Sequence, residues 1–231
     1  MKAIILAAGV GSRIKKFSLK KHKSLIKIGN KSLLTRIVDH LIDINIKDIL
    51  IVTGHKSELI KREIKTKAKY IYFPGYRSSN NLQTLLYVKN QIKGPFLCLF
   101  SDIFFDKKIL LNLKKSSKDI CLAVDTSKVL KDTMRIKIKN KSLIDIGSQI
   151  KVSDGDGNFI GISKFSKKGA INLKKSLKFY QNNYTDYYTL ALKRLIRKKN
   201  TISYFDVKSL YWTEIDFYKD YLNLKKRYVS K

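Results

Sequence analysis

The chain opens with an apolar run that ends abruptly in a short glycine-containing turn. Ala3–Leu6 is typical of a buried strand, and a Gly-x-Gly-Ser-Arg segment follows from Gly9 to Arg13. Glycine has no side chain and tolerates positive φ, so main-chain N–H groups at Gly9 and Gly11 can approach a ligand closely. Arg13 can place its forked guanidinium on phosphate oxygens. A strand, a small-residue loop and a cation in this order predict a site for a nucleoside triphosphate.

The spacing excludes two better-known glycine loops. A P-loop requires two glycines separated by four residues and followed by Lys and Ser or Thr, a spacing that this segment lacks. The dinucleotide-binding pattern G-x-G-x-x-G requires glycine at position 14, which is occupied by Ile14. The residues that follow are basic rather than helix-like, so this pattern does not apply either.

The same segment resembles the signature of the nucleotidyltransferases that activate sugar phosphates and phospho-alcohols. That signature reads L-A-A-G-x-G-S/T-R and, after a spacer, P-K-x-L. Here it stands as Leu6–Arg13 and then His22–Leu25, with His22 in place of the proline. The charge of Lys23 is kept, whereas the constraint that proline imposes before it is lost. The resemblance implies that Arg13 and Lys23 are catalytic. It also implies that the nucleotide is held by Leu6, Ala8, Gly9, Gly11 and Ser12.

The length and composition favour a single domain. The 231 residues correspond to one domain of generous size, and the only prolines are Pro74 and Pro95. No serine- or glycine-rich tract and no internal repeat divides the chain. We expect one nucleotidyltransferase domain over residues 1–231, with a nucleotide-binding half at 1–125. Residues 126–231 are expected to form the acceptor-binding half and a closing C-terminal helix.

The cysteines and the N-terminal residues indicate the cellular compartment in which we expect the protein. Cys98 and Cys121 lie in apolar, strand-like runs, and two buried thiols are typical of a reducing compartment. Lys2 precedes an apolar stretch, as in a signal peptide, but that stretch ends at Ala8 and a basic loop follows. No segment approaches the roughly 20 apolar residues that a membrane span requires. We expect a cytoplasmic protein without a membrane span.

The formal net charge is +31, from 49 lysines and arginines against 18 acidic residues. Clustered cations bind nucleic acid through counterion release, and they also attract anionic lipid. Here the lysines fall in almost every segment, and no RNA-binding aromatic motif or zinc-ligand spacing accompanies them. A lysine-rich composition spread over solvated faces explains the charge better, and it would also steer anionic substrates. We therefore expect no specific nucleic-acid partner.

Strand and helix patterns alternate along the chain. In the first half, strands are predicted at Lys2–Leu6, Asp48–Thr53, Tyr70–Phe73 and Phe96–Phe100, and helices at Ser32–Asp43, Ser57–Ile64 and Asn81–Gln91. Strands joined by single helices form a mostly parallel sheet through right-handed crossovers. In the second half, strands are predicted at Met134–Lys139, Ser142–Ile146, Phe159–Phe165, Ile202–Val207 and Leu210–Ile215, and helices at Lys167–Tyr180, Thr185–Lys198 and Tyr218–Arg227. The pattern predicts a three-layer αβα fold around a mixed, mostly parallel sheet, the Rossmann-like nucleotidyltransferase fold that the resemblance implies.

Two aspartates far apart in the chain are candidate Mg²⁺ ligands. Asp102 follows the predicted strand Phe96–Phe100, and ligands bind at the carboxyl ends of strands in such sheets. Asp216 ends a Glu-Ile-Asp triplet that resembles the late E-I-D motif of the family, whose aspartate supplies the second ligand. Glu214 lies on the same face of a strand as Asp216, and we expect it to be a supporting partner. The alternatives are a loop or helix-capping role for Asp102 and an exposed strand edge for the other two.

The chemistry implied by these residues needs no general base. An acceptor phosphate ionises for the second time near a pKa of about 6, so its oxygen is already anionic at neutral pH. Attack on the α-phosphorus expels pyrophosphate, and Mg²⁺, Arg13 and Lys23 can stabilise the charge on the non-bridging oxygens. Lys20 and Lys21 belong to the same loop, and we interpret them as solvated charge.

A third resemblance lies in Asn80-Asn81-Leu-Gln-Thr84-Leu. It is similar to the N-N/M-x-x-S-L element of small cytidylyltransferases that act on phosphocholine, aminoethylphosphonate or inositol phosphate. The resemblance implies that Asn80, Asn81 and Thr84 help to bind the nucleotide, and capping of the following helix is an equal alternative for either asparagine. A quaternary-amine acceptor would require aromatic faces and a carboxylate. Candidates, for which ordinary packing is the favoured interpretation, are Tyr184, Asp186, Tyr187, Tyr188, Tyr211 and Trp212.

These features predict a Mg²⁺-dependent nucleotidyltransferase that joins a nucleoside triphosphate, with CTP favoured, to a small phosphomonoester or phosphonate. Phosphocholine and aminoethylphosphonate are examples of such acceptors. A hexose-1-phosphate nucleotidylyltransferase is the near alternative. A rival from another class is an inactive basic homologue that binds nucleic acid or a membrane surface. Such a copy would have no reason to keep Arg13, Lys23, Asp102 and Asp216 together.

Overall fold

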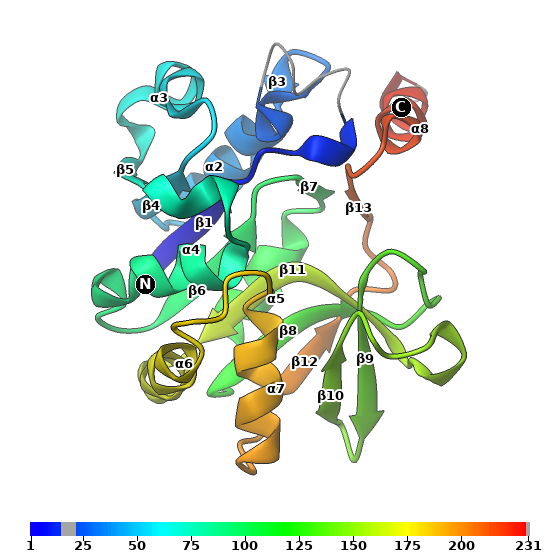
Figure 1. The fold of residues 1–231 in the computed structure, drawn as a ribbon. Coiled ribbons are helices and arrows are strands. Elements are labelled where there is room, and N and C mark those ends of the chain that lie inside the picture. Colours follow the sequence, from blue (N-terminus) through cyan, green and yellow to red (C-terminus); the bar gives the residue numbers. More distant parts are fainter. Residues whose placement is uncertain (15–21, 230–231) are drawn as a thin grey trace.

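The computed structural model describes residues 1–14 and 22–229 (Figure 1). Its central sheet is built from β1 (Lys2–Ala7), β4 (Asp48–Thr53), β5 (Lys69–Tyr72), β6 (Phe96–Phe100), β8 (Ile120–Asp125), β9 (Met134–Lys139), β10 (Ser142–Gly147), β11 (Gly157–Phe165) and β12 (Ser203–Asp206). The strand order is β10-β9-β11-β6-β1-β4-β5, and β8 pairs with β11 and with β12.

Helices cover both faces of this sheet because the side chains of each strand alternate between them. Ile4 and Leu6 of β1 pack into one apolar core, whereas Ile5 and Ala7 pack into another on the opposite face. The first core is closed by α4 (Asn81–Tyr87), α6 (Lys167–Phe179) and α7 (Thr189–Arg197). The second is closed by α2 (Leu33–Asp43), α3 (Ser57–Ile64) and α5 (Lys108–Lys115). The predicted three-layer αβα arrangement is therefore confirmed.

The sheet is mixed, as predicted, but it is not mostly parallel: among the described residues four strand pairs are parallel and four are antiparallel, β10 with β9 among the latter. Parallel pairs join β6, β1, β4 and β5, and also β8 and β12. The long strand β11 runs antiparallel to β6, β8 and β9. Gly161, with φ +83°, lies where the register of β11 shifts, and a Cβ at this position would come within 2.6 Å of the Phe100 ring. The bulge lets one strand pair with β9 at its start and with β6 at its end.

Several predicted boundaries shift in the structure. The helix predicted over Asn81–Gln91 ends at Tyr87, and a 3₁₀ turn over Lys89–Gln91 follows it. The helix predicted from Thr185 begins at Thr189, because the residues before it are tied to side-chain amides of the α4 segment instead of forming a helical turn. Helix α5 was not predicted, although its Ile109, Leu110 and Leu113 are buried at helical spacing.

The strand predicted over Leu210–Ile215 is shorter and lies outside the central sheet. Only β13 (Trp212–Glu214) is extended, and it pairs antiparallel with β7 (Ile103–Phe105). Next to this ribbon the backbone N–H of Ile215 donates to the carbonyl of Asp102 at 3.0 Å. The ribbon therefore places the segment after β13 beside the carboxyl end of β6.

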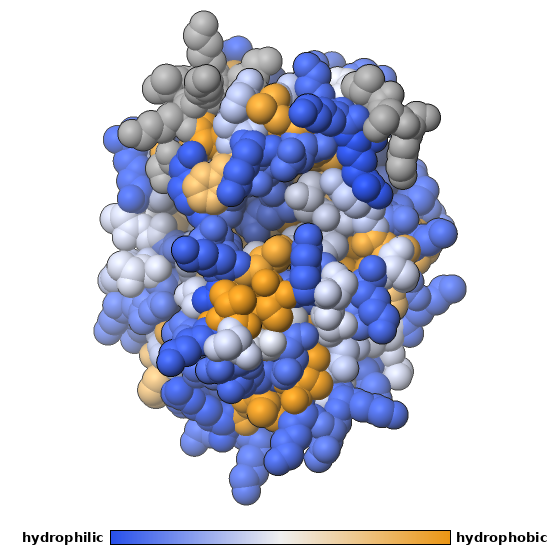
Figure 2. Space-filling view, turned by 90° about the vertical axis from the view of Figure 1, so that its right-hand side faces the viewer, coloured by the Kyte–Doolittle hydropathy of each residue, from blue (hydrophilic) through white to orange (hydrophobic). Residues whose placement is uncertain are grey.

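The C-terminal helix α8 (Tyr218–Val229) returns to the N-terminal part of the fold, beside β2 (Lys27–Ile28) and β3 (Lys31–Ser32) (Figure 1). Leu224 of α8 shares a small apolar core with Ile215, Ile26 and Ile28. Within the described parts of the chain, no helix combines the length and apolarity needed to cross a bilayer. Hydrophilic residues are spread over most of the face in Figure 2 rather than gathered in one stripe.

Candidate active site

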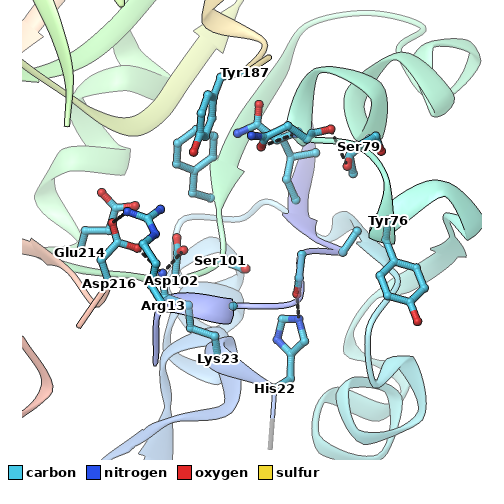
Figure 3. A pocket seen from close by; sticks show the side chains of 18 residues that line it. Arg13, His22, Lys23, Tyr76, Ser79, Ser101, Asp102, Tyr187, Glu214 and Asp216 are labelled. Carbon is cyan, nitrogen blue, oxygen red and sulfur yellow. Dashed lines mark hydrogen bonds and ion pairs between the residues drawn. The ribbon is translucent and has the colours of Figure 1, made fainter. Parts of the chain in front are cut away.

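A pocket of about 220 Å³ opens where β1, β6 and β13 end (Figure 3). The predicted site residues that line it are Leu6, Ala8, Gly9, Gly11, Arg13, Lys23, Asn80, Asn81, Thr84, Asp102 and Asp216. Further lining residues are His22, Tyr76, Ser79, Phe100, Ser101, Tyr187 and Glu214. Figure 3 shows the carboxylates and cations at one end of the pocket and Tyr76 and Ser79 at the other.

The structure does not fully describe three other residues named in the sequence analysis. Ser12 begins a 3₁₀ turn over Ser12–Ile14, and its side chain lies outside the described part of the chain. Lys20 and Lys21 lie outside the described residues altogether. Their assignment as solvated charge remains a prediction.

The glycine loop after β1 is shaped by Gly11 rather than by both glycines. Gly11 has φ +68°, and a Cβ at this position would lie 3.0 Å from the Cβ of Lys23. Gly9 does not adopt the positive φ that we considered for it, and a Cβ there would meet nothing within 4 Å. Gly11 therefore allows the sharp turn and the close approach of Lys23, whereas Gly9 leaves the pocket floor open.

Two cations and two carboxylates meet beside this loop. The Lys23 Nζ lies 2.8 Å from Asp102 Oδ2 and 2.5 Å from Asp216 Oδ1. The Arg13 guanidinium donates to the second oxygen of Asp216 at 2.9 Å. Burial alone would lower the pKa of the Lys23 ammonium, but the carboxylates of Asp102 and Asp216 outweigh it and raise that pKa above its ordinary value. Lys23 is therefore a fixed cation at neutral pH.

Glu214 brings a third carboxyl group to the same point. Oxygen atoms of Asp102, Glu214 and Asp216 all lie within 4.8 Å of one another. Burial, and then the charges of Asp102 and Asp216, raise the pKa of the Glu214 carboxyl to about 8. The oxygen donors of this cluster fit Mg²⁺, a hard cation that prefers carboxylate ligands. Glu214 thus lies within the cluster, beside the two aspartates.

The Asn80 and Asn81 amides lie at the far side of the pocket and already make structural hydrogen bonds. Asn80 caps α4, since its side-chain oxygen accepts from the Asn81 N–H at 2.8 Å. Its side-chain nitrogen donates to the Thr185 carbonyl at 3.2 Å, and the Asn81 side-chain oxygen accepts from the Tyr188 N–H at 2.8 Å. Capping by Asn80 is therefore confirmed, and both residues also line the pocket.

Gln83 was not predicted as a site residue, yet its side chain stabilises the same wall of the pocket. Its side-chain nitrogen donates to the carbonyls of Gln181 and Asn183 at 2.8 and 2.7 Å. These bonds fix the segment that carries Tyr187 into the pocket. The signal was present in the sequence, because Gln83 lies inside the Asn-Asn-Leu-Gln-Thr element.

A second pocket, of about 400 Å³, adjoins the first and shares Glu214 and Asp216 with it. Tyr211 and Trp212 lie on its walls. The Trp212 Nε1–H donates to Asp125 Oδ2 at 2.8 Å, which fixes the indole against the end of β8. The shared carboxyl groups make the two pockets neighbouring compartments of one site.

The aromatic candidates for an amine site do not form one cluster. Tyr188 is fully buried, and its hydroxyl lies 2.9 Å from Ser163 Oγ, so it belongs to the core. Tyr184 is exposed, and Tyr187 lines the first pocket. Ordinary packing is therefore the correct interpretation for Tyr188, whereas Tyr211 and Trp212 belong to the second pocket.

Comparison with known proteins identifies a family and relatives of this chain. Residues 2–132 match the family model described as nucleotidyl transferase. The chain is similar to the CTP:phosphoglutamine cytidylyltransferase of Campylobacter jejuni, with 24% identity over 250 aligned positions that cover 95% of this chain and 97% of the relative. It is 29% identical over 230 positions to the choline-phosphate cytidylyltransferase of Haemophilus influenzae, covering 96% of this chain and 89% of that protein.

A solved structure supports the fold over the full length. The CTP:phosphocholine cytidylyltransferase from Streptococcus pneumoniae superposes with a TM-score of 0.84 at 20% identity, covering 100% of this chain and 99% of that one. With the family model spanning more than half of the chain, the conclusion is direct: this chain belongs to the nucleotidyl transferase family and is a nucleotidyltransferase that acts on phosphorylated substrates.

Proposed function

We propose that this enzyme transfers CMP from CTP to a small phosphomonoester or phosphonate, with Mg²⁺ as cofactor and pyrophosphate as the second product. The observation that carries the proposal is the meeting of Asp102 and Asp216 with Arg13 and Lys23 beside the glycine loop. The choice of CTP is supported by the two relatives described above, which are cytidylyltransferases for phosphoglutamine and for choline phosphate. Phosphocholine, aminoethylphosphonate and similar compounds are the acceptors we propose.

In this reaction an acceptor phosphate oxygen forms a bond to the α-phosphorus of CTP. The bond from that phosphorus to the α,β-bridging oxygen breaks, and its electron pair leaves with pyrophosphate. No proton has to move, since the acceptor is already anionic. Lys23 and Arg13 stabilise the charge that develops on the non-bridging oxygens. Asp102, Asp216 and Glu214 would hold Mg²⁺, which supplies charge neutralisation on the triphosphate when bound.

The first pocket suits the nucleotide and the second suits the acceptor. The glycine loop, which carries Gly9 and Gly11, lines only the first pocket, whereas Tyr211 and Trp212 line only the second. Glu214 and Asp216 lie on the boundary, where the two phosphates would meet. Holding both reactants across one boundary lowers the entropic cost of bringing them together.

We place this reaction in a reducing compartment such as the cytoplasm. Cys98 and Cys121 are both free and buried, and burial raises the pKa of each thiol. Buried, unreactive thiols fit a setting in which disulfides do not form.

A pyrophosphate-release assay on the 231-residue chain tests the proposal. Each of the four nucleoside triphosphates is combined with phosphocholine, aminoethylphosphonate, a phosphorylated amino acid and glucose 1-phosphate, with MgCl₂ or EDTA. We expect turnover with CTP and a small acceptor, and loss of turnover in EDTA. Preference for glucose 1-phosphate would replace the proposal with the hexose-1-phosphate alternative. No turnover with any pair, together with salt-sensitive RNA binding, would favour the inactive basic homologue.

A further inference from the structure

His22 stands where the related signature has proline, and its backbone has kept a proline-like conformation. Its φ of −70° and ψ of 144° are values that a pyrrolidine ring also permits. The side chain is only 2% exposed. The backbone at this position would accept proline, so the buried imidazole must be explained by the contacts of its ring.

Both ring nitrogens of His22 have partners, and these partners determine the tautomer. The Ser24 backbone N–H donates to Nδ1 at 3.2 Å, so Nδ1 carries no proton, and the Ser24 hydroxyl at 2.8 Å donates to it as well. Nε2 lies 3.1 Å from the Gly9 carbonyl oxygen, which can only accept, so Nε2 carries the proton and donates it. Burial lowers the pKa of His22 to about 4, and the hydrogen bond to Gly9 opposes this only in part. The neutral Nε2–H form is therefore the one present at neutral pH.

These bonds connect the two segments that form the cation end of the pocket. Gly9 belongs to the glycine loop, and Ser24 lies in the 3₁₀ turn over Lys23–Leu25 that His22 caps. The loop and the turn touch again where Gly11 packs against the Lys23 side chain. His22 is thus a side-chain bridge from the phosphate-facing loop to the turn that begins with Lys23.

We propose that His22 is a positioning residue, whose imidazole holds Lys23 in register with the glycine loop. Where proline would restrict the chain through φ alone, this chain uses the hydrogen bonds that one buried ring makes to two residues, Gly9 and Ser24. The inference rests on the proposed function to the extent that Lys23 acts on substrate phosphates. The other part of the inference, that His22 fixes the Lys23 turn relative to the glycine loop, does not depend on the substrate.

Three substitutions separate the bond to Gly9 from those to Ser24. In His22→Gln the side-chain nitrogen can reach the position of Nε2 and donate to Gly9, whereas in His22→Asn the side-chain oxygen can replace Nδ1 and keep only the cap on Ser24. His22→Ala loses both. We expect His22→Ala and His22→Asn to lower kcat about tenfold with the KM for CTP changed less than kcat, and His22→Gln to recover most of the loss. Equal activity of the Gln and Asn variants would overturn the role of the Gly9 bond.

A double-mutant cycle tests whether His22 acts through Lys23. In a Lys23→Met background, His22→Ala should reduce kcat less than twofold, because there is no ammonium left to position. A tenfold loss in both backgrounds would mean that His22 acts independently of Lys23. The control is His40→Ala, which removes an imidazole that packs 5.6 Å from the Phe105 ring, away from the pocket, and should leave kcat unchanged.

An NMR measurement on the nucleotide-free protein tests this inference independently of the proposed function. The backbone amide signals of Gly9–Gly11 should shift in the His22→Asn variant and stay near their native positions in His22→Gln. If the wild-type enzyme showed no turnover with any substrate, this comparison would still test the bridge. Unchanged loop signals in His22→Asn would overturn it. Because the comparison uses the two amide variants, it holds even where His22→Ala fails to fold.

Discussion

The Lys23 ammonium lies 2.5 Å from a carboxylate oxygen of Asp216, although 193 positions separate the two residues in the chain. The same nitrogen lies 2.8 Å from Asp102. Lys23 therefore holds two of the three carboxyl groups to which we assign the metal ion. In the nucleotide-free enzyme a lysine and a divalent cation would compete for the same oxygens, and this competition can be measured.

Removing the lysine should strengthen metal binding while it weakens catalysis. In Lys23→Met the carboxylates of Asp102 and Asp216 lose their competing cation, so we expect about tenfold tighter binding of Mn²⁺ in the absence of nucleotide. Turnover should fall by about 100-fold or more, because a cation on the developing charge is lost. Mn²⁺ titration followed by electron paramagnetic resonance measures the first effect, and pyrophosphate release measures the second.

The matched control for this variant is Lys31→Met, since the Lys31 ammonium pairs with Asp39 at 2.7 Å outside the pocket. It should change neither metal affinity nor turnover. Weaker or unchanged Mn²⁺ binding in Lys23→Met would show that the metal uses other oxygens.

Asp102→Asn should abolish Mg²⁺-dependent turnover and leave the fold intact. The Asp102 side chain is 23% exposed, and Lys23 keeps its bond to Asp216, so no buried charge is left without a partner. Circular dichroism and the urea midpoint check the fold, and pyrophosphate release checks activity. Asp43→Asn, which removes an exposed carboxylate paired with Lys107, is the control. An Asp102→Asn enzyme with full activity would refute the metal assignment.

The two glycines of the loop should respond differently to alanine. Gly11→Ala places a Cβ at positive φ and 3.0 Å from the Lys23 side chain, so it should destabilise the protein by about 1–3 kcal/mol and lower kcat. A Cβ on Gly9 meets nothing within 4 Å, so Gly9→Ala should change the free energy of unfolding by less than about 0.5 kcal/mol. It should instead raise the KM for CTP by narrowing the pocket floor. Urea unfolding and steady-state kinetics on both variants make the comparison, which a stability loss in Gly9→Ala would contradict.

Trp212→Ala should raise the KM for the acceptor at least about tenfold and leave the KM for CTP unchanged, because Trp212 lines only the second pocket. Trp212→Phe keeps an aromatic ring and removes the bond to Asp125, so it separates ring contact from positioning. Steady-state kinetics with each substrate varied in turn measures both constants. A larger effect on CTP than on the acceptor would reverse our assignment of the two pockets.

His22 should make stability depend on pH in acid. Its pKa is about 4 in the folded protein and about 6.5 when unfolded, so the unfolded state binds the extra proton first as pH falls. The stability that His22 contributes is fully present above pH 6.5 and is lost between about pH 6.5 and 4, by about 3 kcal/mol. Urea unfolding at the two ends of this pH range should show a smaller loss of unfolding free energy in His22→Gln than in the wild type. Identical losses in the two proteins would mean that His22 is charged in the folded state.

The strongest parts of the prediction from sequence rest on local signals. The apolar run Ala3–Leu6 and the turn after it predicted the central strand and the glycine loop that lines the first pocket. Asp102 was found because it directly follows a buried strand, and strand ends meet at one edge of a parallel sheet. Asp216 depended on the resemblance of its triplet to a family motif, since nothing local connects it to Asp102.

What was missed depends on long-range contacts. The start of α7 shifts to Thr189 because amides of Asn81 and Gln83 bind the preceding segment, a contact across about a hundred residues that periodicity does not contain. The role of His22 was missed for a similar reason. A histidine next to a lysine gives no sign that its ring will reach the Gly9 carbonyl, which depends on how the loop folds back.

Glu214 ends β13 and Asp216 follows it, so both are synthesised after the other assigned site residues. A nascent polypeptide that has emerged only as far as β12 already holds the glycine loop, Lys23 and Asp102, but it has neither of the other two carboxyl groups. Such a partial chain lacks most of the assigned metal cluster. Translation must therefore proceed past Asp216 before the chain can assemble the assigned site.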